Sequence, residues 1–224
     1  MTKPIQIALD GPAAAGKSTI AKIVAERLGY VYIDTGAMYR AITLKALKKG
    51  IDLSSNEEAG KLLLDTDIDL QPSTNGQLVF LDKKNVTEDI RSQDVTKSVS
   101  EMAAHELVRQ RMVELQQQLA EGRGVVMDGR DIGTHVLPDA ALKVFMSATV
   151  EERARRRYEE NKKRGINTPL ADLQKEIAER DKMDSEREFA PLRQAEDALF
   201  LDTTSLTIQE AAAEILKLAE ERLS

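Results

Sequence analysis

The chain has 224 residues, of which 42% are hydrophobic and 31% charged, a composition typical of a folded protein with one sizeable core. The net charge of −6 argues against general nucleic-acid binding, and the absence of cysteine excludes disulfides and thiolate metal sites. No apolar run approaches the roughly 20 residues needed to cross a bilayer and no signal-peptide pattern precedes the first predicted strand, so we expect a cytoplasmic protein.

The first predicted elements are a short buried strand at residues 5–9 and, after a glycine-rich loop, an amphipathic helix. The loop fits the pattern G-x-x-x-x-G-K-[ST], in which backbone N–H groups and the positive end of a helix dipole bind a polyphosphate. Lys17 is expected to reach the β- and γ-phosphates, and the Ser18 hydroxyl to lie on Mg²⁺. With Thr19 at its end, the candidate phosphate loop comprises Gly11, Pro12, Ala13, Ala14, Ala15, Gly16, Lys17 and Ser18.

Four further apolar runs predict buried strands, at residues 31–33, 125–127, 142–146 and 199–201. Helical patterns separate most of them. One helix ends at Gly50, a long charged helix begins at a capping box of Thr149 and Glu152, and the last helix begins at a box of Thr207 and Glu210. Strands that alternate with helices predict an α/β fold, with a parallel sheet covered on both faces.

Residues 67–100 interrupt this alternation. Three short runs, at 68–70, 77–81 and 85–86, predict a small antiparallel sheet inserted between two core units. Pro72, Gly76 and the pair Asp82-Lys83 are expected to form its turns. Helix is predicted to return at about Val99, followed by a core-facing stripe of Leu107, Val108, Met112, Leu115 and Leu119.

A second unusual segment covers residues 150–194. Seven basic and two acidic residues lie between Arg153 and Arg164. Most such side chains form a solvated helix face, but the run is also suited to a flap that closes over phosphates. Gly165 and Pro169 mark a break between helices, as a flap requires.

Polar and cationic residues follow the second and third predicted strands, where ligands bind in open α/β sheets. Arg40 and Arg130 are candidates to bind a second phosphate through bidentate guanidinium contacts. Asp128 is the kind of carboxylate that orders Mg²⁺-bound water beside such a loop, although it could instead cap a helix. Arg180, Asp184 and Arg187 have the spacing of one helical face, where they could equally form surface ion pairs. His105 and His135 are expected to be incidental.

These residues resemble the bacterial cytidylate kinases, a family of the nucleoside monophosphate kinase group of P-loop proteins. The resemblance covers essentially the whole chain. It depends on residues 10–19 (DGPAAAGKST), 34–40 (DTGAMYR), 128–134 (DGRDIGT) and 180–184 (RDKMD), of which the second and third are the more particular to the family.

The resemblance implies transfer of the γ-phosphoryl group of ATP to CMP or dCMP, a step of pyrimidine nucleotide metabolism that uses Mg²⁺. It implies a five-stranded parallel core (residues 1–66, 101–149 and 195–224), a monophosphate-binding insertion of about 67–100 and a helical lid of about 150–190. The expected partners are ATP, CMP and dCMP, with no nucleic acid and no membrane, and the expected state is a monomer.

Residue roles are implied in the same way. Lys17 and the loop amides hold the ATP phosphates with Ser18 toward Mg²⁺, Asp128 reaches the metal through water, and Arg157 is our choice among four lid arginines that spacing does not separate. Lys17, Arg130 and Arg187 are the expected catalytic residues. The implied CMP site has three parts: Arg40, Arg130 and Arg187 with Thr35 at the phosphate; Ser100, Arg109 and Asp131 at the cytosine; and Asp184 with Arg180 at the sugar.

Three alternatives compete with this interpretation. A kinase for UMP or AMP is the nearest, although the loop lacks the glycine pattern typical of adenylate kinases. A GTP-binding switch would need an Asn-Lys-x-Asp motif, and residues 161–164 (NKKR) have arginine in place of the aspartate. A nucleic-acid-binding ATPase is disfavoured by the acidic net charge and by an aromatic content of 4%.

Overall fold

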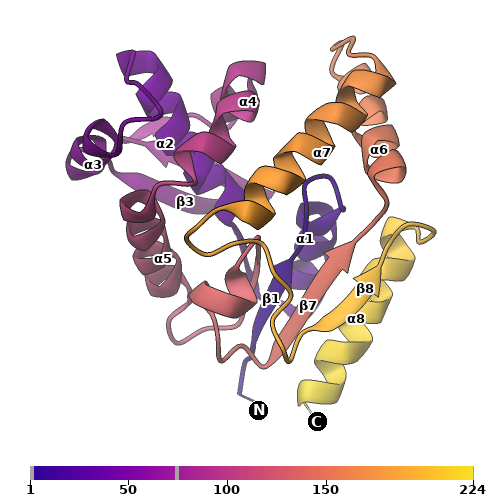
Figure 1. The fold of residues 1–224 in the computed structure, drawn as a ribbon. Coiled ribbons are helices and arrows are strands. Elements are labelled where there is room, and N and C mark those ends of the chain that lie inside the picture. Colours follow the sequence, from indigo (N-terminus) through magenta and orange to yellow (C-terminus); the bar gives the residue numbers. More distant parts are fainter. Residues whose placement is uncertain (1–2, 74–75, 224) are drawn as a thin grey trace.

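The centre of the molecule is a parallel sheet of five strands (Figure 1). The computed structural model describes residues 3–73 and 76–223. The order across the sheet is β2-β6-β1-β7-β8. The bounds are β1 Gln6–Asp10, β2 Val31–Asp34, β6 Val125–Gly129, β7 Leu142–Ser147 and β8 Leu199–Asp202. The five predicted strands are confirmed, and each extends one or two residues further toward its carboxyl end.

Alternating strand residues divide the core into two layers, because successive side chains point to opposite faces of a sheet. Ile7 and Leu9 of β1 belong to the cluster that α1 and α8 cover, whereas Ala8 belongs to the cluster under α2 and α5. These helices span Lys17–Leu28 (α1), Ile208–Leu223 (α8), Thr35–Lys49 (α2) and Glu106–Ala120 (α5). The sheet is therefore covered on both faces, as its apolar strands predict. No helix within the described ranges is both long and apolar enough to cross a membrane.

The predicted antiparallel insertion is present as a three-stranded sheet, β3-β4-β5. Asp82 and Lys83 form the second turn, with φ angles of 48° and 67°. The expectation of turns at Pro72 and Gly76 is wrong, because both lie within strands, and residues 74 and 75 between them are outside the described ranges. Proline has no N–H to donate to a neighbouring strand, and Pro72 is tolerated because β3 lies at the edge of its sheet. The bounds are β3 Ile68–Ser73, β4 Gly76–Leu81 and β5 Lys84–Asn85.

Helix returns earlier than Val99. A 3₁₀ turn (η1, Asp89–Arg91) leads into α4 (Gln93–Met102), which begins where the Ser92 hydroxyl accepts the Val95 N–H at 3.4 Å. The predicted stripe lies on the next helix, α5, where Val108 and Met112 are buried but Leu107 is 52% exposed. A further short helix, α3 (Asn56–Leu64), packs against α5.

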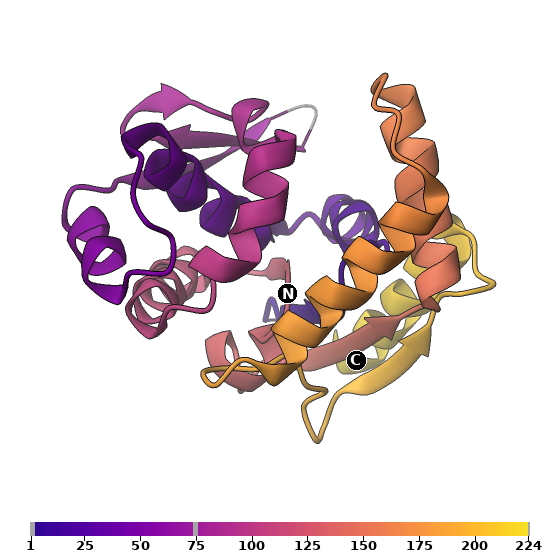
Figure 2. The same ribbon diagram turned by 45° about the horizontal axis from the view of Figure 1, so that its top comes forward.

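Residues 150–186 form a helical hairpin of α6 (Val150–Lys163) and α7 (Leu170–Glu186). Gly165, at φ 72°, lies in the predicted break between them. In Figure 2 the hairpin, in orange, stands across from α4 and the small sheet, in magenta. Only half of the box at Thr149 forms, because the Glu152 carboxylate binds Arg155 and Arg156 instead. The box of Thr207 and Glu210 is complete.

One side chain of the small sheet hydrogen-bonds to the main sheet. Gln77 of β4 accepts the Asp34 N–H at 3.1 Å and donates to the Tyr32 carbonyl at 2.9 Å. The amide thus pairs with the outer edge of β2 as a neighbouring strand would. It fixes the insertion next to Asp34, whose carboxylate caps α2 by accepting the Ala37 N–H.

Gly11 tests how tightly the loop after β1 is packed. Its φ is 147°, and a Cβ built there would lie 2.0 Å from the Met146 carbonyl oxygen of β7. We expect Gly11→Ala to lower the free energy of unfolding in urea by about 3 kcal/mol, because the backbone of β7 must move. Gly29→Ala is the matched control. Its φ is 66° with no atom within 4 Å, so only the left-handed strain of about 1 kcal/mol remains. Equal losses for the two variants would contradict the steric argument.

Candidate functional site: two adjoining cavities at the carboxyl edge of the sheet

The loop between β1 and α1 is shaped by three residues with positive φ. Gly11, Ala14 and Gly16 have φ angles of 147°, 60° and 90°. Such turns direct successive N–H groups toward one point. The N-cap residue of α1 is Gly16, which makes no side-chain cap hydrogen bond, so the first amides of the helix can bind an anion. Residues 13–19 line the cleft beside the loop, whereas Gly11 and Pro12 of the predicted set do not.

That cleft has a volume of about 320 Å³ and is strongly cationic. Three acidic side chains line it, those of Asp34, Asp128 and Glu160. Eight basic side chains from the core, the region around the small sheet and the hairpin line it as well: Lys17, Lys22, Arg40, Arg91, Arg130, Arg157, Arg164 and Arg180. Such an excess of positive charge favours a polyanionic ligand.

The arginines of the cleft repel one another. Burial and repulsion from Arg130 lower the pKa of Arg180 to about 9. Burial and repulsion from Arg157 lower the pKa of Arg40 to about 10. The Nε atoms of Arg157 and Arg180 are buried and have no hydrogen-bond partner among the described residues. An anion bound here would relieve the repulsion and accept these N–H groups.

Lys17 lies at the base of the cleft, 5% exposed, and donates to the Pro12 carbonyl at 2.7 Å. Burial and the nearby Arg130 lower its pKa to about 7. Opposite it, Asp128 accepts the Ser18 and Tyr32 hydroxyls, each at 2.8 Å. Burial and repulsion from Asp34 raise the pKa of Asp128 to about 6. Asp128 lies within β6, and its recorded side-chain hydrogen bonds come from these two hydroxyls and not from the first amides of a helix, in contrast to the alternative of a helix cap.

The residues at this point fit Mg²⁺. No group of three or more His, Asp or Glu side chains able to hold a metal ion occurs in the part of the chain that the structure describes. Mg²⁺ does not need such a group, because it keeps several waters and binds substrate phosphates with one or two protein oxygens. The Ser18 hydroxyl and the Asp128 carboxylate lie 2.8 Å apart beside the phosphate loop, so an ion and its waters would find both oxygens at one point.

A second, smaller cavity of about 50 Å³ adjoins the cleft. The two share Gly36, Gly129, Arg130 and Arg180 as lining residues. Ser100, Arg109 and Asp131, predicted to act together, all line the small cavity, as do Thr35, Tyr39, Asp184 and Arg187. The sequence places these residues up to 152 positions apart, and the fold brings them to one place.

Charges of alternating sign line this cavity. The Asp131 carboxylate pairs closely with Arg109 and lies 3.6 Å from Arg187, while Asp184 accepts from Arg130 at 2.8 Å. Burial alone would raise the pKa of Asp184, but Arg130 and Arg180 outweigh it and hold the pKa below its ordinary value. Arg109 also lies over the Tyr39 ring, with its guanidinium carbon 5.3 Å from the centroid.

Some predicted residues occupy places that the spacing did not indicate. α7 ends at Glu186, because Arg187 has φ −59° and ψ 142°, so Arg180, Asp184 and Arg187 do not share one helical face. Arg187 and Thr35 line the small cavity and not the cleft with Lys17, and their place at the acceptor phosphate stays a prediction. Arg40 and Arg130 do line the cleft.

The four lid arginines are separated by their contacts. Arg157 lines the cleft. Arg153 is 4% exposed and donates to the Ala13 carbonyl, and Arg156 donates to the Ala15 carbonyl, so both lie against the outside of the loop. Arg155 is 62% exposed and binds only Glu152 among the contacts recorded for it. The charge run therefore contains three different environments.

Three residues at the candidate site were not singled out from the sequence. Asp10, whose pKa burial raises to about 6, accepts the Ile132 and Gly133 N–H groups at 2.8 and 2.7 Å, and so holds the π-helical turn η2 (Ile132–Val136) after β6. Tyr32 orients Asp128, and Arg91 lines the cleft opposite the hairpin. A carboxylate at the end of an apolar strand is a signal that could have identified Asp10.

The fold and the site together define an α/β protein of the P-loop class: the phosphate loop joins the first strand to the first helix, and a cationic cleft lies at the carboxyl edge of the sheet. The model of the cytidylate kinase family matches residues 7–221, and the chain belongs to that family. A cytidylate kinase of Lysinibacillus sphaericus (strain C3-41) is 64% identical over 223 residues, covering 100% of both chains. A cytidylate kinase of Bacillus subtilis (strain 168) is 59% identical over 222 residues, covering 99% of both.

Two solved structures resemble the fold at low identity. An uncharacterized protein from Eubacterium ventriosum ATCC 27560 has a TM-score of 0.56 at 13% identity, with 98% of this chain and 99% of that chain covered. A gluconokinase from Sinorhizobium meliloti 1021 has a TM-score of 0.51 at 15% identity, with 100% and 95% covered. These likenesses support the fold alone.

The buried pair of Arg109 and Asp131 leads to a stability prediction. We expect Arg109→Met to lower the free energy of unfolding by about 3 to 5 kcal/mol, because Asp131 would stay buried with one weaker cationic partner. Arg111→Met on the same helix is the control. Its side chain is 45% exposed and pairs only with Glu114, so its change should stay within about 0.5 kcal/mol. Urea unfolding of both variants gives the comparison, and similar midpoints would contradict the prediction.

Proposed function

We propose that the protein transfers the γ-phosphoryl group of ATP to CMP or dCMP, giving ADP and CDP or dCDP. The observation that carries the proposal is the pair of adjoining cavities. One is a cationic cleft at a phosphate loop, and the other is a small polar cavity that shares Arg130 and Arg180 with it. A donor polyphosphate and an acceptor nucleoside can therefore meet at a common wall of guanidinium groups.

In this proposal the loop amides and Lys17 bind the ATP phosphates, and Arg157 binds them from the hairpin. Arg40 and Arg130 bind the acceptor phosphate at the shared wall, and Arg187 reaches it from the small cavity. Ser18 holds Mg²⁺ directly and Asp128 holds it through water, and the ion supplies neutralisation of phosphate charge. We propose the hairpin α6–α7 as the lid and the region around the small sheet as the monophosphate-binding part.

Positioning and charge neutralisation account for catalysis without a general base. The acceptor oxygen belongs to a phosphate that is already ionised at neutral pH, so no proton has to be removed before it attacks. Lys17, Arg130 and Arg187 neutralise the charge that spreads over the transferred group, in a site whose cations are held before the substrates arrive. The proposed monomeric state and cytoplasmic location remain predictions.

Cytosine fits the small cavity by its hydrogen-bonding edge. Its exocyclic amine donates, whereas N3 and O2 accept. Asp131 can accept from the amine while Arg109 and Ser100 donate to the acceptor atoms. Uracil has a carbonyl in place of the amine and would face the Asp131 carboxylate with a second acceptor, which disfavours UMP. Asp184, with Arg180, is proposed to bind the sugar hydroxyls.

A panel of CMP, dCMP, UMP and AMP, each assayed with ATP and Mg²⁺, tests this function. We expect kcat/KM for CMP and dCMP to exceed that for UMP by about 100-fold or more. Asp131→Asn keeps the shape but adds an amide donor that can face the uracil carbonyl. It should reduce the ratio of CMP to UMP efficiency at least about tenfold. Low turnover of CMP relative to AMP in the wild type would reject the proposed substrate, and an unchanged ratio in the variant would reject Asp131 as the residue that reads the base.

Lys17 leads to a pH prediction. Its pKa of about 7 means that at pH 8 most of the free protein carries a neutral Lys17, whereas bound triphosphate favours the charged form. We therefore expect binding of Mg-ATP at pH 8 to take up about one proton. Calorimetry in two buffers with different ionisation enthalpies measures this uptake. Lys17→Arg, which stays charged in both states, should abolish it, and equal uptake in the two proteins would contradict the assignment.

A further inference from the structure

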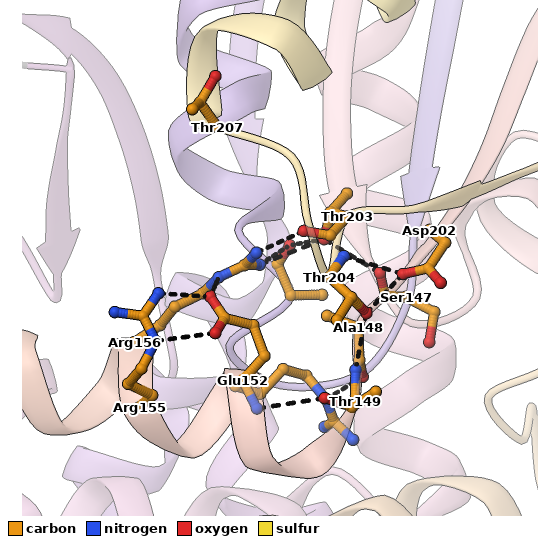
Figure 3. Close-up of polar contacts among 12 residues, drawn as sticks. Ser147, Ala148, Thr149, Glu152, Arg155, Arg156, Asp202, Thr203, Thr204 and Thr207 are labelled. Atoms are coloured by element: carbon orange, nitrogen blue, oxygen red, sulfur yellow. Dashed lines mark hydrogen bonds and ion pairs between the residues drawn. The ribbon is translucent and has the colours of Figure 1, made fainter.

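The Ala15 carbonyl of the phosphate loop is held by two residues from outside the loop. The Thr203 hydroxyl, just after β8, lies 3.2 Å from this carbonyl oxygen. Arg156 of α6 donates to the same oxygen through Nη1 at 3.4 Å. Figure 3 shows Arg156 reaching from α6 to Thr203 on the loop that follows β8. Neither side chain lines the phosphate cleft.

Thr203 is buried, and its hydroxyl lies between the carbonyl oxygens of Ala15 and Ser147. The residue is 1% exposed, and its N–H donates to the Ser147 carbonyl at 2.7 Å. Its hydroxyl lies 3.0 Å from that same Ser147 carbonyl, but a hydroxyl has a single proton to donate. Each carbonyl also accepts a second donor, the Thr203 amide at Ser147 and the Arg156 guanidinium at Ala15, so the hydroxyl lies within hydrogen-bonding distance of both and links the phosphate loop to the end of β7.

Arg156 is fixed from both sides. Its Nε donates to the Glu152 carboxylate at 2.9 Å, and its Nη atoms donate to the hydroxyl and the carbonyl of Thr203 (Figure 3). Glu152 in turn accepts from Arg155 at 2.8 and 2.7 Å. The guanidinium of Arg156 is therefore oriented before any ligand binds.

Holding this carbonyl sets the direction of the next amide. A trans peptide unit is planar, with its C=O and N–H pointing in opposite directions. A carbonyl of Ala15 that is bound on the outer side of the loop therefore turns the Gly16 N–H inward. Gly16 lines the cleft at φ 90°, a conformation that glycine adopts readily. Arg153 likewise donates a hydrogen bond to the Ala13 carbonyl, at 3.2 Å.

We propose that Arg156 and Thr203 are positioning residues for the donor phosphates: by holding the Ala15 carbonyl they keep the Gly16 N–H directed at the bound polyphosphate. The inference rests on the proposed function, in which this loop binds the phosphates of ATP. It goes beyond that function because it assigns Arg156 to positioning the loop, whereas the arginines of the cleft are proposed to contact a substrate. It also ties the orientation of a loop amide to the hairpin.

Four variants test the proposal. Thr203→Val removes the hydroxyl at nearly constant volume, and Thr203→Ser keeps it. Arg156→Met removes the guanidinium, and Arg155→Met is its matched control, because Arg155 shares the partner Glu152 but reaches neither Thr203 nor Ala15 in the recorded contacts. The measurements are the Kd of inorganic tripolyphosphate with Mg²⁺ by calorimetry, the KM values for ATP and CMP, kcat and Tm.

We expect Thr203→Val and Arg156→Met to weaken tripolyphosphate and ATP by the same factor, about five- to tenfold, the size of one lost hydrogen bond. Thr203→Ser and Arg155→Met should stay within about twofold of the wild type, and the KM for CMP should not change in any variant. If Thr203→Val fails to fold, Arg156→Met against Arg155→Met gives the same comparison.

Two results would overturn the proposal. Weaker ATP binding with unchanged tripolyphosphate binding would mean that the two residues serve the nucleoside and not the loop. A lower Tm with both affinities unchanged would mean that they serve stability alone. Tripolyphosphate binding does not depend on turnover of CMP, so a wrong acceptor assignment would leave this test intact.

Discussion

Guanidinium groups gathered at the carboxyl edge of the parallel sheet are the constraint on which the rest of this structure depends. Charges of one sign cannot be brought together out of water unless each finds a partner, because both desolvation and mutual repulsion oppose it. Arg109 and Arg187 are partnered by Asp131, and Arg130 by Asp184. Arg157 and Arg180 keep buried N–H groups with no hydrogen-bond partner among residues 3–73 and 76–223.

The number of carboxylates available to the guanidinium groups differs between the two regions of the site. Four arginines and two carboxylates line the small cavity, and each carboxylate pairs with two of the guanidinium groups, so hydrogen-bonding direction contributes most to what binds there. In the cleft eight basic side chains face three acidic ones, so the total positive charge determines what binds there. Arg130 belongs to both regions. It donates a hydrogen bond to Asp184 on one side and lines the cleft of the phosphate loop on the other. A ligand in either cavity therefore changes the electrostatic surroundings of the other.

The sequence was sufficient for the strands, the phosphate loop and the hairpin break because each is encoded locally. Apolar runs between helices predicted all five core strands, and Gly165 with Pro169 predicted the break. The start of α4 was missed because Ser92, a residue with a weak signal, caps it, and apolar periodicity becomes visible only several residues later.

Contacts between side chains were harder to predict from the sequence. The spacing of Arg187 suggested a helical face, but the chain leaves the helix at that residue, and its partner Asp131 is 56 positions away. Contacts such as Thr203 to Ala15, 188 positions apart, depend on which strands become neighbours and carry no local pattern. The resemblance to the family brought the residues of the small cavity together, which periodicity could not do.

The two hydrogen bonds of Gln77 have a consequence for self-association. β2 is an outer strand of the main sheet, and the free backbone groups of such a strand can template pairing with another molecule. Gln77 occupies the Tyr32 carbonyl and the Asp34 amide on that side, and it does so with a side chain that cannot extend a ladder any further. The contact that fastens the insertion to the core thus also closes this margin of the sheet to intermolecular strand addition.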